Sequence, residues 1–376
     1  MEPQVCVVGC AAGFSGDRPE AALPLVETLI DSGQPAFLFF EVLAERTLAL
    51  AQLAKRQDST KGCEERLEAF LKPVIGLCLA HNIPIVGNFG AANPQAAAKR
   101  ITALARRLNL GRVKIGVIEG DDLLQVLSPR EIRELQIIDC PDLFDREMVS
   151  ANAYLGGEPI AEALEGGANV IVTGRVADPA LALGPLVHHF NWAWNDWDLL
   201  SGGTIAGHLL ECATQVSGGY FADPGVKDVP DLAWVGCPFA QVHADGTMVI
   251  GKAAKTGGLV SRATVTEQLL YEIHDPSAYV TPDVIADITE VSISEIGRNR
   301  VSVKGARGKP RPDQLKVTVG FEDGWLGEGE ISYSGPNALE RARLACSLLR
   351  ERLERYCPNC QLRTDIIGVC SVFNDD

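Results

Sequence analysis

The chain has 376 residues, of which 46% are hydrophobic and 22% charged, and its formal net charge is -15. A sizeable core is therefore possible, and the acidic balance argues against a nucleic-acid surface, which needs a basic footprint. Eleven cysteines are too few for a disulfide scaffold in a chain of this length. No secretory signal opens the sequence and no apolar stretch is long enough to span a membrane, so we expect reduced cysteines in a cytoplasmic protein.

Strand and helix patterns alternate from residue 5 to residue 190. Each predicted strand is apolar throughout, and helical periodicity separates one strand from the next. Strands of this kind indicate a parallel sheet that is covered by helices on both faces. We therefore predict a largely parallel, doubly wound α/β sheet with strands at residues 5–9, 36–40, 83–87, 113–118 and 169–173.

The composition changes near residue 218. Residues 218–240 are rich in Gly, Pro and Asp, which is typical of a loop or a domain junction. The later predicted strands are shorter, the last two at residues 328–333 and 366–372, and a helix is predicted at 337–356. We therefore predict two domains, a Rossmann-like α/β domain at residues 1–217 that carries the site and a smaller α+β domain at residues 218–376.

Three of the predicted strands, at residues 5–9, 83–87 and 169–173, run into turns of small residues. Each turn contains an acid or amide and then a proline. In an open α/β sheet such turns gather outside the carboxyl ends of the strands, where ligands of this architecture bind. We therefore expect one substrate-binding site that contains Asp17, Arg18, Asn88, Asn93, Arg175 and Asp178.

Helix capping is the alternative explanation for the acids and amides of these turns. Asp17, Asn93 and Asp178 each precede a proline that suits the first turn of a helix. Capping leaves the arginines unexplained, because a cation beside a helix N terminus is unfavourable unless an anion shares the space. Arg18 and Arg175 therefore indicate a clamp for a carboxylate or a phosphate.

Clustered carboxylates follow two further strands. Glu41 and Glu45 are four residues apart, so on a helix they share a face and could serve as acid and base. Glu119, Asp121 and Asp122 follow the strand at 113–118 and resemble a site for a hard cation such as Mg²⁺. The alternatives are a solvated helix face for Glu45 and a polar turn capped by Asp122.

Three further patterns each allow two interpretations. Asn152 could orient a substrate oxygen, or it could belong to a loop that bonds its own backbone. The glycine-rich turn at residues 9–16, with Glu41 ending the next strand, resembles a dinucleotide-binding turn but departs from GxGxxG spacing. His208 and Glu211 are three apart on a predicted helix and could reach a shared cleft, although a core position suits the histidine better.

Several long segments resemble one family. They read GFSGDRPEAA, FEVLAERTLALAQL, GNFGAANP, IEGDD, SANAYLG, TGRVADPAL, GHLLECATQVSGGYFADPG and HDPSAYVTPDV. Together they are similar to the acyclic terpene utilisation (AtuA) family, which is also catalogued as a domain of unknown function. The resemblance implies a role in bacterial catabolism of acyclic terpenoids such as citronellol and geraniol, through branched acyl-CoA and hydroxy-acid intermediates. It assigns no residue a role, and it leads us to expect a shorter C-terminal part here than in relatives.

These observations favour an enzyme. We predict lyase or hydratase chemistry on a small carboxylic acid or acyl-CoA, with the two arginines as clamp and Glu41, Glu45 or Asp121 as the acid/base group. The sequence contains no serine-elbow motif and no phosphate-binding GxxxxGK[ST] loop. The alternatives are a nucleotide-dependent oxidoreductase and a non-catalytic subunit of a partner enzyme. We expect no nucleic-acid or membrane partner, and a homo-oligomer.

Overall fold

This computed structural model describes residues 5–135 and 146–369, and its largest sheet is a mixed one of nine strands. Its strand order is β11-β12-β8-β7-β1-β2-β3-β6-β4. The five strands at one end of this order run parallel, which confirms the predicted parallel sheet of the N-terminal half. They are β1 (Val5–Cys10), β2 (Ala36–Phe40), β3 (Ile85–Gly87), β6 (Val170–Thr173) and β4 (Ile115–Ile118).

The other four strands come from later in the chain and run antiparallel. They are β7 (Pro238–His243), β8 (Met248–Lys252), β12 (Arg300–Lys304) and β11 (Ser292–Gly297). Because β7 pairs directly with β1, residues on both sides of position 217/218 share one sheet. The chain instead divides into the units Met1–Glu322 and Asp323–Asp376. The predicted two-domain arrangement at 1–217 and 218–376 is therefore not confirmed. The sequence did not reveal the shared sheet, because β1 and β7 are far apart along the chain.

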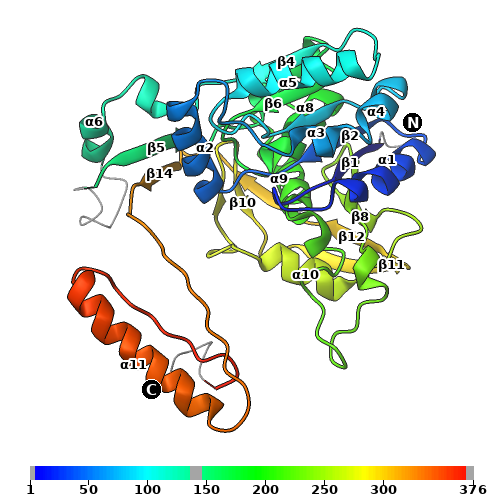
Figure 1. The fold of residues 1–376 in the computed structure, drawn as a ribbon. Helices are drawn as coiled ribbons and strands as arrows, with labels where there is room; N and C mark the ends of the chain where they lie inside the picture. The colour runs from blue at the N-terminus through cyan, green and yellow to red at the C-terminus, as the bar shows by residue number, and fades with distance from the viewer. Residues whose placement is uncertain (1–4, 136–145, 370–376) are drawn as a thin grey trace. The chain divides into compact units, whose positions relative to one another are not determined.

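Helices cover both faces of the sheet (Figure 1). Side chains alternate along a strand, so Cys6 and Val8 of β1 enter one core and Val7 enters the other. The first core contains α7 (Glu158–Glu165), α8 (Ala180–Phe190) and α9 (Trp197–Glu211). The second contains α1 (Ala22–Asp31), α3 (Leu67–Leu71), α4 (Ile75–Ala80) and α5 (Pro94–Arg107).

A two-stranded ribbon pairs β5 (Met148–Ala153) with β14 (Val317–Phe321). Helix α2 (Glu45–Gln57) lies against it, and Arg56 Nη2 donates to the carbonyls of Met148 and Val149 at 3.0 and 2.8 Å. The interpretation of Asn152 as a loop residue is wrong, because it lies within β5. Further elements are α6 (Pro129–Glu134), α10 (Arg262–Leu270) and a sheet of β13 (Arg307–Lys309), β10 (Ile285–Asp287) and β9 (Tyr279–Val280).

The unit Asp323–Asp376 contains one helix in its described part, α11 (Ala338–Tyr356), which confirms the helix predicted at 337–356. The strand predicted at 328–333 is wrong, because that segment is irregular and pairs with no other strand of the described chain. Of the strand predicted at 366–372, residues 366–369 form a turn and the rest lie outside the described residues. Cys357 and Cys360 form a disulfide, which corrects the expectation of reduced cysteines for this pair alone, since the other cysteines among the described residues are free. None of the described helices has the length and apolar character needed to cross a membrane.

Candidate functional site

Polar side chains converge where the parallel strands end. Hydrogen bonds and ion pairs link residues that follow β2, β3, β4 and β6 with residues of α2 and β5. We call this set, together with Tyr154 and Lys316, the rim cluster. The predicted site residues that it contains are Glu41, Glu45, Asn88, Asp121, Asn152, Arg175 and Asp178.

Arg175 is the centre of the rim cluster. Its side chain is 1% exposed, and a buried charge is costly unless it is paired and hydrogen-bonded. Nη1 donates to the carbonyl of Leu43 at 2.6 Å, Nε donates to the carbonyl of Val176 at 2.9 Å, and Nη2 pairs with Asp178. Nη2 also lies 3.8 Å from Glu41 Oε1. Because these partners occupy the guanidinium, Arg175 positions its neighbours and does not present an open clamp.

Glu41 is the buried carboxyl group of the cluster. Its Oε1 accepts hydrogen bonds from Asn88 Nδ2 at 2.7 Å and from the amide of Leu43 at 3.0 Å. Asn88 is fixed in turn, because its Oδ1 accepts from the first amide after Glu41 at 2.8 Å. Burial raises the pKa of Glu41 well above its usual range, Asp178 raises it further, and Arg175 and Asn88 oppose this only in part. Glu41 therefore stays protonated well above the pH at which a glutamate usually ionises.

Glu45 is an exposed carboxylate of the same cluster. Its Oε1 accepts a hydrogen bond from the Tyr154 hydroxyl at 2.5 Å and lies 3.9 Å from Lys316 Nζ. Partial burial alone would raise its pKa, but the Tyr154 bond and the charges of Arg175 and Lys316 outweigh burial and lower the pKa of Glu45. The Glu45 and Lys316 side chains are 56% and 70% exposed, so both face solvent. The cluster thus combines one carboxyl group with a raised pKa and one with a lowered pKa.

Lys316 was missed by the sequence analysis. It immediately precedes β14 and reaches the cluster through the pairing of β14 with β5, which no local motif reports. Its Nζ lies 4.6 Å from the centroid of the Tyr154 ring, and the Arg175 guanidinium carbon lies 4.7 Å from the same centroid. Tyr154 therefore contacts one buried and one exposed cation.

Asp121 supports the cluster from inside the protein. Its Oδ2 accepts hydrogen bonds from the amide of Arg175 at 2.9 Å and from Asn152 Nδ2 at 2.8 Å. Glycine is required at Gly174, because an added Cβ would lie 2.5 Å from Asp121 Oδ1. Burial raises the pKa of Asp121, which is 4% exposed. Asp121 therefore holds the Arg175 backbone and Asn152, and it is less accessible than Glu45.

The turn after β1 is held by its own neighbours. Asp17 Oδ2 accepts a hydrogen bond from the Gly13 amide at 2.8 Å. Arg18 donates to the carbonyls of Ala233 and Val235 at 3.2 and 2.6 Å. In the described chain, Arg18 shares none of these hydrogen-bond partners with the arginine of the rim cluster. These contacts do not bring the two arginines together, so the joint clamp stays a prediction.

Asn93 and the predicted metal ligands have local partners. Asn93 caps α5, Glu119 accepts from Gln95 Nε2 at 2.8 Å, and Asp122 caps a short helix by accepting from the Leu124 amide at 3.2 Å. In the part of the chain that the structure describes, no group of three His, Cys, Asp or Glu side chains is arranged to hold a metal ion. The geometry therefore does not support the predicted Mg²⁺ site.

A second buried acid lies at the end of α9. Glu211 Oε1 lies 3.1 Å from His208 Nδ1, and its other carboxylate oxygen has no partner among the described residues. Burial raises the pKa of Glu211 to about 7, and His208 opposes this only in part. One helical turn earlier, a Cβ added at Gly207 would lie 2.5 Å from the carbonyl oxygen of Pro179. His208 is buried as a core histidine would be, but its partner is a titratable acid close to the turn that carries Asp178.

Protein atoms fill the space beside the glycine-rich turn. A Cβ added at Gly13 would lie 2.5 Å from the carbonyl oxygen of Glu211, and one at Gly9 would lie 3.0 Å from the Leu25 side chain. In a dinucleotide-binding turn the corresponding glycines admit a pyrophosphate. Here they admit α9 and α1, so helix packing accounts for these two glycines.

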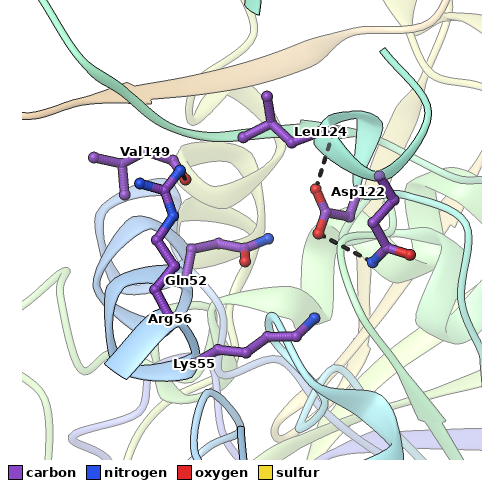
Figure 2. Close-up of a pocket in the computed structure, with 7 residues that line it drawn as sticks. Gln52, Lys55, Arg56, Asp122, Leu124 and Val149 are labelled. Atoms are coloured by element: carbon purple, nitrogen blue, oxygen red, sulfur yellow. Dashed lines mark hydrogen bonds between the residues drawn. The ribbon is translucent and has the colours of Figure 1, made fainter. Parts of the chain in front are cut away.

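A cavity of about 600 Å³ adjoins the rim cluster, and we call it the α2 cavity (Figure 2). Helix α2, which begins at Glu45 of the rim cluster, forms one wall. The segment that follows Asp121 forms the facing wall, so cavity and cluster share two segments of the chain. The lining residues are Gln52, Lys55, Arg56, Asp122, Leu124, Gln125 and Val149.

Comparison with known proteins gives one match. The family model described as acyclic terpene utilisation family protein AtuA matches residues 6–376. Neither the curated proteins nor the solved structures contain a match. Because the family model spans almost the whole sequence, this chain belongs to the acyclic terpene utilisation (AtuA) family.

Proposed function

We propose that this protein is a catabolic enzyme that performs lyase or hydratase chemistry on a small or CoA-linked hydroxy acid. Membership of the family links the chain to acyclic terpene utilisation. The observation that carries the proposal is the contrast between Glu41, whose pKa is raised, and Glu45, whose pKa is lowered. Two carboxyl groups with opposite pKa shifts are the arrangement that supplies an acid and a base at one pH.

Removal of water from a hydroxy acid needs two proton transfers. A base takes the proton from the carbon beside the carbonyl, and an acid protonates the departing hydroxyl group. In the proposed site Glu45 is the base, because it is ionised and exposed, and Glu41 is the acid. Asp178, with a side chain 34% exposed, lies between the buried Arg175 and solvent. The reverse sequence of proton transfers adds water.

The substrate carboxylate or thioester carbonyl needs a cation. Arg175 is occupied by Leu43 and Asp178, and Arg18 is bonded to a loop. Lys316 is the exposed cation beside Glu45, so in this proposal it replaces the predicted arginine clamp. A homo-oligomer stays a prediction.

Two alternatives are separated by simple measurements. A nucleotide-dependent oxidoreductase would quench its tryptophan fluorescence with NAD(H) or NADP(H) at micromolar concentration, although the Gly13 turn is filled by α9. A non-catalytic subunit would show no reaction that depends on Glu41 or Glu45.

The test is turnover of branched hydroxy acids and their CoA thioesters, with loss or gain of water followed by mass spectrometry. We expect Glu41→Gln and Glu45→Gln each to lower kcat by about 10²- to 10⁴-fold, because each removes one proton-transfer group. Glu119→Gln is the matched control, since Glu119 is an exposed carboxylate that accepts a hydrogen bond from the exposed Gln95. Unchanged turnover in both site variants would remove the proposal.

A further inference from the structure

We propose that the α2 cavity is a binding site for a small monocarboxylate that also carries a hydroxyl group. The choice of ligand class rests on the proposed function, whereas the site itself rests on the side chains that line the cavity. One wall supplies hydrogen-bond donors and a positive charge. The facing wall supplies a carboxylate, and two apolar side chains complete the lining.

Gln52 is the strongest indication of a ligand. It is 6% exposed, and its Nε2 has no hydrogen-bond partner among the described residues. A buried donor without a partner is unfavourable, because the amide has lost water and gained nothing in exchange. Figure 2 shows the Gln52 amide extending from α2 into the space that Asp122 faces. A carboxylate oxygen placed there would accept the hydrogen bond that Gln52 lacks.

Lys55 adds the charge that a carboxylate needs. It lies almost one helical turn after Gln52 and lines the same cavity. Its Nζ donates to the carbonyl of Ala92 at 2.6 Å, and an ammonium group has three hydrogens to donate. Arg56 differs, because its guanidinium pairs with Glu147 at 3.0 Å and also bonds to carbonyls of β5. Gln52 and Lys55 are therefore the pair available to the two oxygens of a carboxylate.

Asp122 determines what the rest of the ligand must be. It accepts hydrogen bonds from the Leu124 amide at 3.2 Å and from Gln125 Nε2 at 3.1 Å, and a carboxylate has about four acceptor positions. It can accept a further bond from a hydroxyl group, and its charge would repel a doubly charged phosphate. The side chains of Leu124 and Val149 suit a short apolar portion.

The experiment is isothermal titration of the full chain with 3-hydroxy-3-methylbutyrate. 3-Methylbutyrate, which lacks the hydroxyl, and inorganic phosphate are the matched probes. We expect the hydroxy acid to bind, and the analogue and phosphate each to bind about tenfold or more weakly, because Asp122 is then left without its donor or is repelled. Equal affinity for all three probes, or no binding of any, would overturn the proposal.

Two variants localise the binding. Gln52→Leu and Lys55→Met should each weaken binding of the hydroxy acid about tenfold, because each removes one donor while keeping an apolar side chain of similar length. Gln95→Leu is the matched control outside the cavity, and thermal unfolding shows whether each variant is folded. Unchanged affinity in both folded cavity variants would place the ligand elsewhere.

The two proposals fail in different ways. Glu41→Gln should retain binding of the hydroxy acid even where it abolishes turnover, because Glu41 does not line the cavity. Binding that depends on Gln52, without turnover of any substrate, contradicts the proposed function and leaves this inference standing. Turnover by a folded Gln52→Leu variant that also binds the hydroxy acid with unchanged affinity in the titration contradicts this inference and leaves the function standing.

Discussion

The turns after β1 and β6 each carry an arginine close to an aspartate, yet the two arginines have different surroundings. Arg175 is buried and meets the carboxylates of Asp178 and Glu41, whereas Arg18 is half-buried and bonds to loop carbonyls. Strand order explains the difference. β6 lies between two parallel strands, so turns with the same direction flank its end, whereas β1 borders antiparallel β7 and meets the loop that precedes it. A turn motif therefore specifies a site only together with its neighbours in the sheet.

The largest effect is expected when Arg175 is removed. Arg175→Ala should lower the free energy of unfolding by about 3–5 kcal/mol, because it leaves the carbonyl of Leu43 without its donor and the carboxylate of Asp178 without its cation. Urea unfolding at neutral pH measures the loss. Asp178→Asn is the matched control, since it removes a partly exposed carboxylate and should cost less. A loss below about 1 kcal/mol for Arg175→Ala, typical of a surface pair, would mean that Arg175 is solvated.

The next effect concerns the glycines of the first turn. Gly13→Ala should destabilise the fold by about 1–3 kcal/mol, because the added methyl group meets backbone atoms of α9 that cannot move aside. The structure places that Cβ 2.5 Å from the carbonyl oxygen of Glu211. Gly16→Ala is the control, because its Cβ meets only the side chain of Phe14, which is exposed and can rotate. Equal melting temperatures for the two variants would contradict the packing of Gly13 on α9.

The parallel half of the sheet could be predicted because its signals are local. Each apolar strand and each helix can be recognised within its own segment, and such strands form parallel sheets covered on both faces. The continuation of the sheet beyond residue 217 has no such local signal. Strand β7 (Pro238–His243) begins at the end of the stretch rich in Gly, Pro and Asp, yet it pairs with β1. Its partner is more than 200 residues away, so no local pattern announces the pairing.

The rim cluster was partly predictable for the same reason. Glu41, Asn88 and Arg175 follow parallel strands, and general sheet geometry brings such positions to one edge. Lys316 and Gln52 were not predictable. Lys316 reaches Glu45 through the β5–β14 ribbon, and the importance of Gln52 lies in a missing hydrogen bond, which only coordinates reveal.

Glu211 ends helix α9, which packs closely against the turn after β1 at Gly13 and against Pro179 at Gly207. Its pKa of about 7 in the folded protein lies above the usual value of 4.5. The folded state then holds a proton that the unfolded chain has released, so stability falls as pH rises from the usual value through about 7. We expect Glu211→Gln to flatten the fall of the melting temperature between about pH 5 and 8, because the glutamine cannot release a proton. Asp283, whose pKa burial raises to about 6, keeps part of the slope, so the variant profile is reduced and not level. Parallel profiles would show that Glu211 does not titrate in this range.

The smallest loss of stability is expected for Arg18, and it can be compared directly with the loss for Arg175. Arg18→Ala should cost less than about 1.5 kcal/mol, because the carbonyls of Ala233 and Val235 can bond to water once the half-buried guanidinium is gone. Among the described residues Arg18 bonds to carbonyls and pairs with no carboxylate, in contrast to Arg175. Urea unfolding of both variants under one set of conditions gives the difference. If Arg18→Ala cost as much as Arg175→Ala, or lowered turnover as much as Glu41→Gln, the turn after β1 would belong to the site, and antiparallel β7 would not be what separates the two arginines.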